Sequence, residues 1–462
     1  MFVNKKLFTT ALLGLLVTLS IIALILSLVR VEDVSLPPTV QYGMVFDAGS
    51  SHTSLFVYEW DSDKQNNTGV VSQTFSCDVQ GPGITSYAND PPKAGDSLRE
   101  CLEEALKVVP AAKQRDVSAY FGATAGMRLL SSAADQVLAE IAKTIQEYPV
   151  AFCGAQIITG EEEGAYGWIT INYLLESFTK VGGKKHFFGA LDLGGASTQI
   201  SFAPKGSFIN WNETSRFMLY GYNYNIYTHS YICYGQNEMW KRLAKELIVE
   251  SPSSTLVEHP CYPKDYKETI SLSSFRTSPC TNQSDPHLPL DDRNVTLEGR
   301  SNASGCLVAV RKLFNFSACG QSQDCSFDGI YQPPISGQFF AFSAFYYNFK
   351  FLNLTEGQSL ATVRETIERF CARTWEDVCF LLWEAMGSFK SKWVGEEDTD
   401  VGWTLGYMLN LTNMIPAEAP VRVKAHTPSL WAAAIAFITL TLALGLVALV
   451  VLLWTSKQWK RQ

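Results

Sequence analysis

The chain lacks any block of basic residues that would suit a nucleic-acid partner. Its 462 residues carry a formal net charge of −8, and no Lys/Arg-rich run lies outside the extreme termini. Proteins that bind nucleic acids present clustered positive charge to the phosphate backbone. We therefore exclude DNA and RNA as partners. With 47% hydrophobic residues, the chain is long enough to form two or three domains of ordinary size.

Charged side chains are absent altogether from two long stretches. Residues 7–29 and 430–454 contain 23 and 25 residues without a charge, and a helix that spans a bilayer needs about 20 apolar residues. A cleaved signal peptide is the alternative for the first stretch, but the run is too long and no small-residue cleavage site follows it. We predict a retained transmembrane helix at each end. Gly14 and Gly445 lie mid-span, where glycines favour helix pairing, including pairing within a homo-oligomer.

The flanks of these spans predict the topology. Basic residues precede the first span and follow the second, which by the positive-inside rule places tails 1–6 and 455–462 in the cytosol. Eleven cysteines and eight N-x-S/T sequons all lie between the spans, as expected in an oxidising, glycosylating compartment. We predict a multi-pass plasma-membrane protein with an extracellular ectodomain. Its predicted glycosylation sites are Asn66, Asn212, Asn282, Asn294, Asn302, Asn315, Asn353 and Asn410.

Two short stretches, 43–53 and 189–198, resemble each other. In each, an apolar run ends in an aspartate (Asp47, Asp192), small residues and hydroxyls follow at once, and a second alternating apolar run begins. This pattern predicts a β-hairpin with a glycine-rich turn. Glycines let backbone N–H groups approach a phosphate, and an aspartate at a strand end can hold a divalent cation directly or through water. One such motif is usually only a turn, but two copies 145 positions apart predict a clamp for a polyphosphate.

Two further motifs lie between these hairpins. Thr124 and Arg128 follow a strand predicted over 117–121. Arg128 is either a surface ion-pair partner or a phosphate ligand, and the neighbouring hairpins favour the second, because guanidinium suits anionic oxygens. Three glutamates, Glu161 to Glu163, then open a helix predicted to run to about residue 178. They either complement the helix dipole or include a general base.

These motifs together resemble the ecto-nucleoside triphosphate diphosphohydrolases (ecto-apyrases), in their cell-surface branch. The likeness runs from about Gly43 to Asn413 and includes all five family motifs. It implies an α/β fold: a two-lobed ectodomain like that of actin, hexokinase and the heat-shock ATPases, with a duplicated ribonuclease H-like core, between two transmembrane helices. Lobe I would span 30–158, lobe II 159–394, and 395–428 would return to lobe I and the membrane.

The resemblance also implies substrates and residue roles. Nucleoside tri- and diphosphates (ATP, ADP, UTP, UDP) would be hydrolysed to monophosphates with Ca²⁺ or Mg²⁺. Glu163 would be the general base, with Ser197 and Gln199 placing the attacking water. Tyr347 would stack on the nucleobase. The implied phosphate contacts are Gly49, Ser50, Ser51, His52, Thr53, Thr124, Arg128, Gly194, Gly195, Ala196 and Ser197, and the implied cation site, reached through water, is Asp47, Asp192, Thr124 and Trp403.

Glu161 stands where the family usually has glutamine. An extra carboxylate there would raise the pKa of Glu163.

The cysteines give partly open predictions. Cys77 and Cys101 flank a Gly/Pro loop and are predicted to pair. The odd total leaves at least one thiol free or intermolecular, and Cys153, in an apolar context, is the candidate for a buried free thiol. The family implies the pairs Cys233–Cys280, Cys261–Cys306 and Cys319–Cys325. Pairing of Cys371 with Cys379 is the remaining option.

The chain departs from the family between Cys371 and Val401. Relatives carry a longer segment there, and the missing stretch is on the order of one βαβ unit, about 30 residues. The second wall of the base pocket would lie in that segment. Two alternatives to an apyrase therefore stay open. One is a sugar kinase of the same superfamily, disfavoured because ATP is scarce outside cells. The other is a surface glycoprotein, or splice-shortened form, that binds nucleotides but hydrolyses them poorly.

Overall fold

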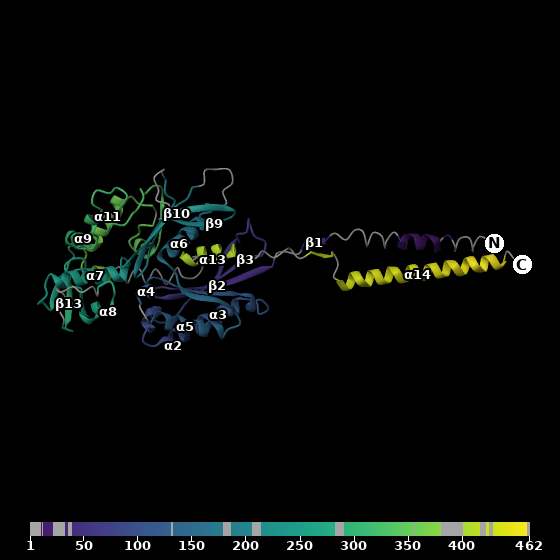
Figure 1. The fold of residues 1–462 in the computed structure, drawn as a ribbon, viewed down its shortest axis with the longest axis horizontal. Helices are drawn as coiled ribbons and strands as arrows, with labels where there is room; N and C mark the ends of the chain where they lie inside the picture. Colours follow the sequence, from purple (N-terminus) through teal and green to yellow (C-terminus); the bar gives the residue numbers. More distant parts are fainter. Residues whose placement is uncertain are drawn as a thin grey trace. The chain divides into compact units, whose positions relative to one another are not determined.

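The computed structural model describes residues 11, 13–21, 33–35, 39–130, 133–178, 186–205, 214–281, 291–355, 357–379, 401–415, 422–424 and 428–459 (Figure 1). The chain divides into two compact units. One consists of Val40–Ala417, and the other of the two chain ends, Met1–Thr39 and Glu418–Gln462.

The unit formed by the chain ends contains one membrane-spanning candidate among the described residues. Helix α14 (Pro428–Trp459) includes the apolar stretch Ile435–Thr455, which is long enough to cross a bilayer. This agrees with the span predicted at 430–454. Most of the span predicted at 7–29 lies outside the described residues, although residues 13–21 are helical.

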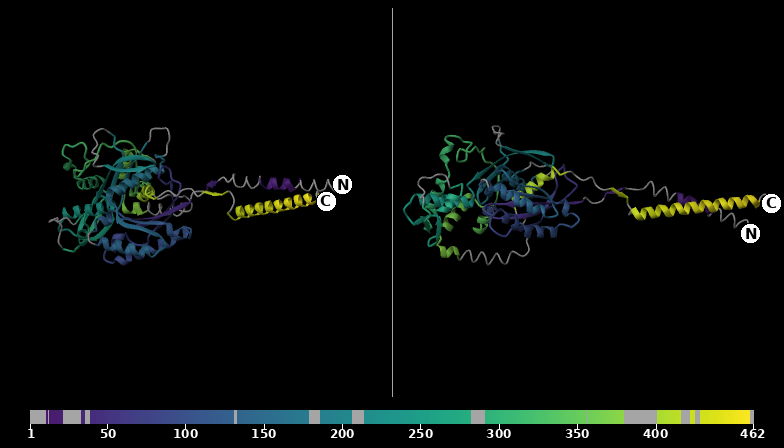
Figure 2. Two further views of the ribbon diagram at one scale, coloured as in Figure 1. Left: turned by 45° about the vertical axis from the view of Figure 1, so that its right-hand side comes forward. Right: turned by 60° about the horizontal axis from the view of Figure 1, so that its bottom comes forward.

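Contacts within this unit join the two chain ends. Residues 13–21 lie beside α14 in both views (Figures 1 and 2), and a Cβ added at Gly445 would be 2.8 Å from Val17 Cγ2. The contact predicted at Gly445 is therefore seen within one chain. Strand β1 (Asp33–Ser35) pairs antiparallel with β15 (Arg422–Lys424).

A five-stranded sheet forms the centre of the first lobe of the larger unit, in the order β4-β3-β2-β5-β6. Its strands are β2 (Val40–Ala48), β3 (Thr53–Asp61), β4 (Val71–Asp78), β5 (Ser118–Ala123) and β6 (Ala151–Ile157). Strands β2 and β3 form the predicted hairpin, and β5 pairs parallel with β2. Apolar residues alternate along β2, so that Met44 and Phe46 join one core and Val45 another. Both faces of this sheet are therefore buried.

Helices of the first lobe cover one of these faces (Figure 1). Leu102 and Ile141 from two of them are fully buried against Met44 and Phe46. The helical segments are η1 (Ile84–Tyr87), α2 (Pro91–Ser97), α3 (Arg99–Val108), η2 (Gln114–Asp116), α4 (Ala125–Arg128) and α5 (Ala134–Gln146).

A second five-stranded sheet, ordered β14-β7-β8-β10-β9, repeats the beginning of the first. Its strands are β7 (Gly189–Leu193), β8 (Ser197–Phe202), β9 (Thr214–Leu219), β10 (Tyr222–Ile232) and β14 (Phe339–Ser343). Strands β7 and β8 form the second predicted hairpin, and β14 pairs parallel with β7 as β5 does with β2. Within the described ranges, no strand lies beyond β14 where the first sheet has β6. Among the described strands, β14 is thus the edge of this sheet.

Two helices lie between the sheets and join the lobes (Figure 1). Helix α6 (Gly160–Leu174) starts with a capping box formed by Thr159 and Glu162. Helix α13 (Trp403–Thr412) packs on it so closely that a Cβ added at Gly406 would be 2.0 Å from the Tyr166 carbonyl oxygen. Both helices are apolar on nearly all sides because both sheets cover them.

The remaining elements form an insertion and an edge. The insertion holds a three-stranded sheet ordered β11-β13-β12, and α10 and α11 follow β14 without a fully buried residue. These elements are α7 (Gln236–Val249), β11 (Leu256–His259), β12 (Lys267–Ser271), α8 (Ser273–Thr277), β13 (Asn294–Gly299), α9 (Ala303–Lys312), η4 (Phe316–Cys319), α10 (Ala344–Phe351) and α11 (Leu360–Cys371).

Four disulfides form as predicted. They are Cys77–Cys101, Cys233–Cys280, Cys261–Cys306 and Cys319–Cys325. Three of them staple the insertion and the loops after it, where loop-rich structure buries little apolar surface and a cross-link restricts the unfolded chain.

Two cysteine predictions are wrong. Cys371 and Cys379 are both free, because Cys371 ends α11 and a separate helical stretch, 375–379, begins after Thr374 bridges to Lys264. Cys153 is free as expected but exposed, because it lies on β6, the edge strand of its sheet.

The close packing of α13 on α6 yields a test of stability. Replacing Gly406 by alanine forces its Cβ against the Tyr166 backbone, which cannot move aside as a side chain can. Overpacking of this kind typically costs about 1–3 kcal/mol. We expect Gly406→Ala to lower the melting temperature of the ectodomain. Gly402→Ala is the matched control, because the nearest atom to an added Cβ there is 4.0 Å away. Equal melting temperatures for both variants would contradict the packing described.

Candidate active site

The turns of the two hairpins touch each other. A Cβ added at Gly195, in the β7–β8 turn, would be 2.3 Å from Ser50 Oγ in the β2–β3 turn. The third motif joins them, because a Cβ added at Gly126 would be 2.9 Å from Ser50 Cα and the Thr124 N–H donates to the Ala48 carbonyl at 3.1 Å. The structure therefore brings together three motifs that are far apart in the sequence.

The paired aspartates end their strands beside these turns. Burial raises the pKa of both Asp47 and Asp192 to about 6. The Asp47 carboxylate raises the pKa of Asp192 further, whereas a hydrogen bond from Ser343 lowers it. Trp403 and then His52 lower the pKa of Asp47. Each aspartate thus lies within the electrostatic reach of the other, as the sequence predicts for one shared site.

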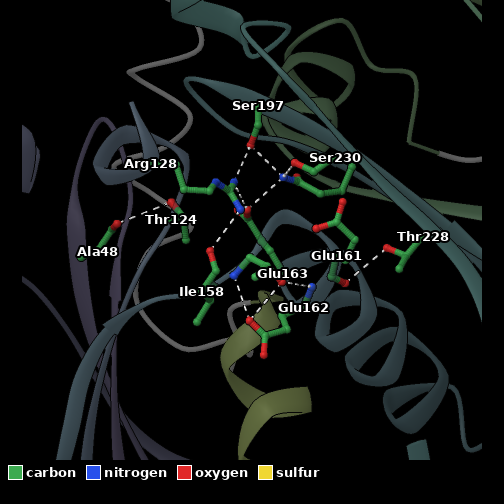
Figure 3. A network of polar contacts seen from close by, with 12 residues as sticks. Ala48, Thr124, Arg128, Ile158, Glu161, Glu162, Glu163, Ser197, Thr228 and Ser230 are labelled. Atoms are coloured by element: carbon green, nitrogen blue, oxygen red, sulfur yellow. Dashed lines mark hydrogen bonds and ion pairs between the residues drawn. The ribbon is translucent and has the colours of Figure 1, made fainter. Parts of the chain in front are cut away.

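Glu163 lies in the first turn of α6 at the centre of a polar network (Figure 3). Its Oε2 accepts from Arg128 Nη2 at 2.6 Å and from Gln199 Nε2 at 2.9 Å. Arg128 also reaches Ser197 Oγ at 3.3 Å and the Ile158 carbonyl at 3.2 Å. The network joins α4 of the first lobe to α6 and β8 of the second, so the predicted catalytic residues come together here.

The environment of Glu163 disfavours its charged form. Burial raises its pKa to about 8, Arg128 acts against this, and the carboxylates of Asp192 and Asp47 raise the pKa further. The sequence predicted that Glu161 raises the pKa of Glu163. Glu161 is instead exposed and is not among the main causes of the raised pKa. A buried carboxyl group that titrates near neutral pH is a common property of acid–base catalysts.

Arg128 contacts both the predicted base and the second hairpin. Its side chain is 18% exposed, and its guanidinium bonds to Glu163 and Ser197. A cation in this position stabilises the ionised glutamate within a buried site.

The donor atoms fit a hydrated divalent cation. Carboxylate oxygens are preferred by Ca²⁺ and Mg²⁺, and Mg²⁺ usually keeps several waters. No group of three His, Cys, Asp or Glu side chains in the described chain is placed to hold an ion, so Asp47 and Asp192 would need water as further ligands. Thr53 Oγ1 and Gln199 Oε1 are buried without a hydrogen-bond partner among the described residues. Such atoms usually bind water or a ligand. Trp403 lies close to Asp47, and Thr124 Oγ1 lies 3.5 Å from the Ala48 carbonyl.

Tyr347 lies on α10, which is not one of the elements that carry this network. It is 65% exposed on α10, with its ring centroid 5.7 Å from that of Tyr346 in an edge-on arrangement. The segment predicted to lack the second wall of the base pocket falls largely on 380–400, outside the described residues.

Two serines were missed by the sequence reasoning. Ser343, at the end of β14, bonds to Asp192 and has φ 54°, a strained value for a non-glycine residue. Ser230 Oγ on β10 lies 2.8 Å from Gln199 Nε2. Ser230 lies opposite Gln199 on the neighbouring strand, and this pairing would have identified Ser230 as a site residue. Predicting the pairing requires the register of β8 and β10.

Most of the sequons that the structure describes are accessible. Their asparagines are exposed at Asn66, Asn294, Asn302, Asn315 and Asn353, and half-buried at Asn410. Asn212 and Asn282 lie outside the described residues. Asn410 lies within α13, and Thr412 of its sequon is fully buried.

The two touching hairpins, the paired aspartates and the buried glutamate define a phosphate-handling protein of the actin-like type. Residues 34–385 match the model of the GDA1/CD39 (nucleoside phosphatase) family. The chain belongs to this family.

Individual relatives agree with this assignment. The chain is 48% identical to ectonucleoside triphosphate diphosphohydrolase 8 of Gallus gallus, covering 95% of this chain and 96% of the relative. It is 45% identical to the Homo sapiens protein of the same name, covering 96% and 97%. The sequences of the motifs also resemble this eighth member of the enzyme series. The first alignment extends over 480 positions, more than the 462 residues of this chain, so the relative has residues that this chain lacks.

One solved structure shares the fold. The crystal structure of nucleoside triphosphate hydrolases from Neospora caninum is similar with a TM-score of 0.55 at 12% identity, covering 82% of this chain and 85% of that one. The actin-like α/β architecture predicted for the ectodomain is therefore confirmed.

The raised pKa values predict how the cation-free protein responds to pH. Folding moves the pKa of Asp47 and Asp192 from 3.8 to about 6, and that of Glu163 from 4.5 to about 8. The folded state therefore binds more protons than the unfolded state between these values, and the free energy of unfolding falls as pH rises through this range. With a chelator present, we expect a lower melting temperature at about pH 8 than at about pH 5.

A divalent cation should offset this loss. Ca²⁺ or Mg²⁺ should raise the melting temperature more at the higher pH, because ionised carboxylates bind it. Asp47→Asn should reduce this gain, whereas Asp63→Asn, a change at an exposed carboxylate of the same lobe, should not. A cation effect that is equal at both pH values and in both variants would rule out the site.

Proposed function

We propose that this chain hydrolyses the terminal phosphates of nucleoside tri- and diphosphates, yielding nucleoside monophosphates. The observation that carries the proposal is the position of Glu163, buried within the electrostatic reach of two aspartates and hydrogen-bonded to Gln199 and Arg128. The family assignment and the names of the relatives support the same reaction.

The two touching turns would hold the phosphates. Small residues leave the backbone N–H groups accessible to anionic oxygens, and the hydroxyls of Ser50, Ser51 and Thr53 add further donors. Thr124 and His52 lie beside the first turn: Thr124 bonds to Ala48, and His52 acts on the charge of Asp47. Gly49 opens the first turn, and Gly194, Gly195 and Ala196 form the second. Each turn approaches from its own lobe, so a chain of phosphates would be held from two sides.

Asp47 and Asp192 would hold the cation, with Thr124 and Trp403 contacting its water shell. A bound Ca²⁺ or Mg²⁺ neutralises charge on the phosphates and on the leaving group. It would also lower the pKa of the neighbouring carboxylic acids by charge attraction.

Glu163 would take a proton from the attacking water. Ser197 and Gln199 would orient that water toward the terminal phosphorus, in line with the bond that breaks. Arg128, together with the bound cation, would favour the ionised form of Glu163 before the transfer. Because the transferred group is already electrophilic, positioning and charge stabilisation supply most of the acceleration, and no covalent intermediate is required.

Base recognition would be permissive. The Tyr347 ring is largely exposed, and stacking on an aromatic face accepts any nucleobase. Adenine and uracil nucleotides are therefore both proposed as substrates: ATP, ADP, UTP and UDP.

The substrates would be extracellular. We propose a plasma-membrane protein with two transmembrane helices, at 7–29 and 430–454, and both tails in the cytosol. Four disulfides and several exposed sequons in the larger unit support an ectodomain outside the cell.

A second candidate function rests on the short segment between Cys371 and Val401. The Gallus gallus relative has residues that this chain lacks, and a shortened lobe II would favour a surface glycoprotein that binds nucleotides but hydrolyses them poorly. Against it, Gln199 already bonds to both Glu163 and Ser197, with Asp47 and Asp192 within electrostatic reach of Glu163. Release of phosphate from ATP and ADP by the purified protein separates the two functions.

The role of Glu163 is tested by Glu163→Gln. This change keeps the size of the side chain but removes the base, which is typically worth about 10²–10⁴ in rate. We expect cation-dependent phosphate release to fall by at least about 100-fold while nucleotide affinity is retained. Glu161→Gln is the matched control in the same helical turn and should leave turnover near that of the parent. Parent-like ATP hydrolysis by Glu163→Gln would show that another group is the base.

The proposed topology has its own test. A peptide tag fused after Gln462 should be detected by antibody only after cells are permeabilised, whereas the ectodomain should be detected on intact cells. Staining of the C-terminal tag on intact cells would contradict a cytosolic tail.

A further inference from the structure

Ser230 lies where β10 meets the catalytic strand β8. The two strands are antiparallel, with Ser230 opposite Gln199 and Thr228 opposite Ser201. Residues opposite one another, or two apart on one strand, share a face of the sheet. This face looks toward the first turns of α6, since a Cβ added at Gly160 would be 2.3 Å from Ser230 Cβ. Figure 3 shows Ser230 beside Ser197 and Arg128 in the same network.

The Gln199 amide nitrogen faces more acceptors than it has hydrogens. Its Nε2 is 2.9 Å from Glu163 Oε2, 2.7 Å from Ser197 Oγ and 2.8 Å from Ser230 Oγ. An amide nitrogen carries two hydrogens and accepts none. In the state that takes a proton from water Glu163 is ionised, and if the amide were turned over, its oxygen would then face that carboxylate and both groups would be acceptors. The amide nitrogen therefore faces Glu163. At any one time, one of its three acceptors receives no hydrogen from it.

The Gln199 amide oxygen, in contrast, has no donor near it among the described residues. Oε1 is buried with no hydrogen-bond partner in the described part of the chain, and the residue is 1% exposed. A buried acceptor of this kind needs a water or ligand to offset its desolvation. The orientation of the amide plane decides where that water lies.

The three acceptors would behave differently during the proposed reaction. One O–H bond of water breaks and its proton passes to Glu163. The water oxygen bonds to the terminal phosphorus, and the bridging P–O bond breaks with its electron pair left on the leaving oxygen. Glu163 then becomes a poorer acceptor, and Ser197 lies in the turn that would hold the phosphate. Ser230 exchanges nothing with the substrate.

We propose that Ser230 is a positioning residue for the hydrolysis: it anchors the Gln199 amide to β10, so that Gln199 Oε1 holds the attacking water in place. The inference rests on the proposed function and adds a residue to it. Ser230 acts through Gln199 and does not touch the reacting atoms.

The first experiment compares Ser230→Ala with Thr228→Val in steady-state ATP hydrolysis with Mg²⁺ or Ca²⁺. Misplacement of a reacting group by about 1 Å can cost about 100-fold. We expect Ser230→Ala to lower kcat by roughly 10- to 100-fold with KM changed less than about twofold. Thr228→Val removes the hydroxyl of the next cross-strand pair, whose Oγ1 lies 2.7 Å from Ser201 Oγ, and should leave kcat unchanged.

The stability of Ser230→Ala should be close to that of the parent. The change removes one acceptor from a nitrogen that has two others, so no buried donor loses its partner. Ser230→Cys serves as a second variant if the alanine protein folds poorly, because a thiol fills the space but accepts hydrogen bonds weakly. Its kcat should also fall.

A double-mutant cycle with Gln199→Ala identifies the path of the effect. If Ser230 acts through Gln199, adding Ser230→Ala to Gln199→Ala should lower kcat no further. Independent, multiplicative losses would overturn the inference, as would a parent-like kcat for Ser230→Ala.

Failure of the inference is distinguishable from failure of the proposed function. If the parent releases no phosphate in a cation-dependent manner, the function itself is wrong and the inference falls with it. If the parent is active and Glu163→Gln is not, a parent-like Ser230→Ala overturns the positioning role alone.

Discussion

Three acidic side chains share one buried site with a single arginine, and much of the structure follows from this electrostatic constraint. Asp47, Asp192 and Glu163 each lose hydration on folding, and the two aspartates both raise the pKa of Glu163. Arg128 offsets part of the free-energy cost of burying these carboxylates, because it forms an ion pair with Glu163. The remaining negative charge suits a divalent cation that also binds anionic phosphate. The same residues that destabilise the empty site would thus make it a strong site for a metal–nucleotide complex.

The duplicated architecture explains how such charges are brought together. Each aspartate ends the first strand of a hairpin, and the turns of the two hairpins touch through Ser50 and Gly195. Helix α6 leads directly from β6 of the first sheet toward β7 of the second, which places Glu163 at the boundary of the lobes. Glycines at the contacts between α6, α13 and β10 allow this close approach. Small displacements of one lobe against the other would therefore change the distances between all three carboxylates.

Most of the fold follows from local sequence patterns, whereas several site contacts do not. The two hairpins, the helix after Gly160 and the disulfide of Cys77 with Cys101 could be predicted from apolar alternation, turn chemistry and spacing. Helices α2 and α3, which meet at Leu98, cover one face of the first sheet (Figure 1). Side-chain pairing across the lobes could not be predicted from such local patterns. Arg128 and Glu163 are separated by 35 residues, and their ion pair depends on how the sheets pack rather than on any local motif.

The second sheet bears on this site through one residue of its outermost described strand. That strand, β14, pairs with β7 and ends at Ser343, which bonds to Asp192. A strained φ of 54° at Ser343 persists only if neighbouring structure enforces it. In the first sheet the equivalent strand, β5, is covered by β6, whereas β14 is an edge within the described part of the chain. Asp192 is thus linked to the outermost described strand through Ser343. A displacement of β14 would then reach the cation site before it reaches Glu163, whose partners lie on α4 and β8.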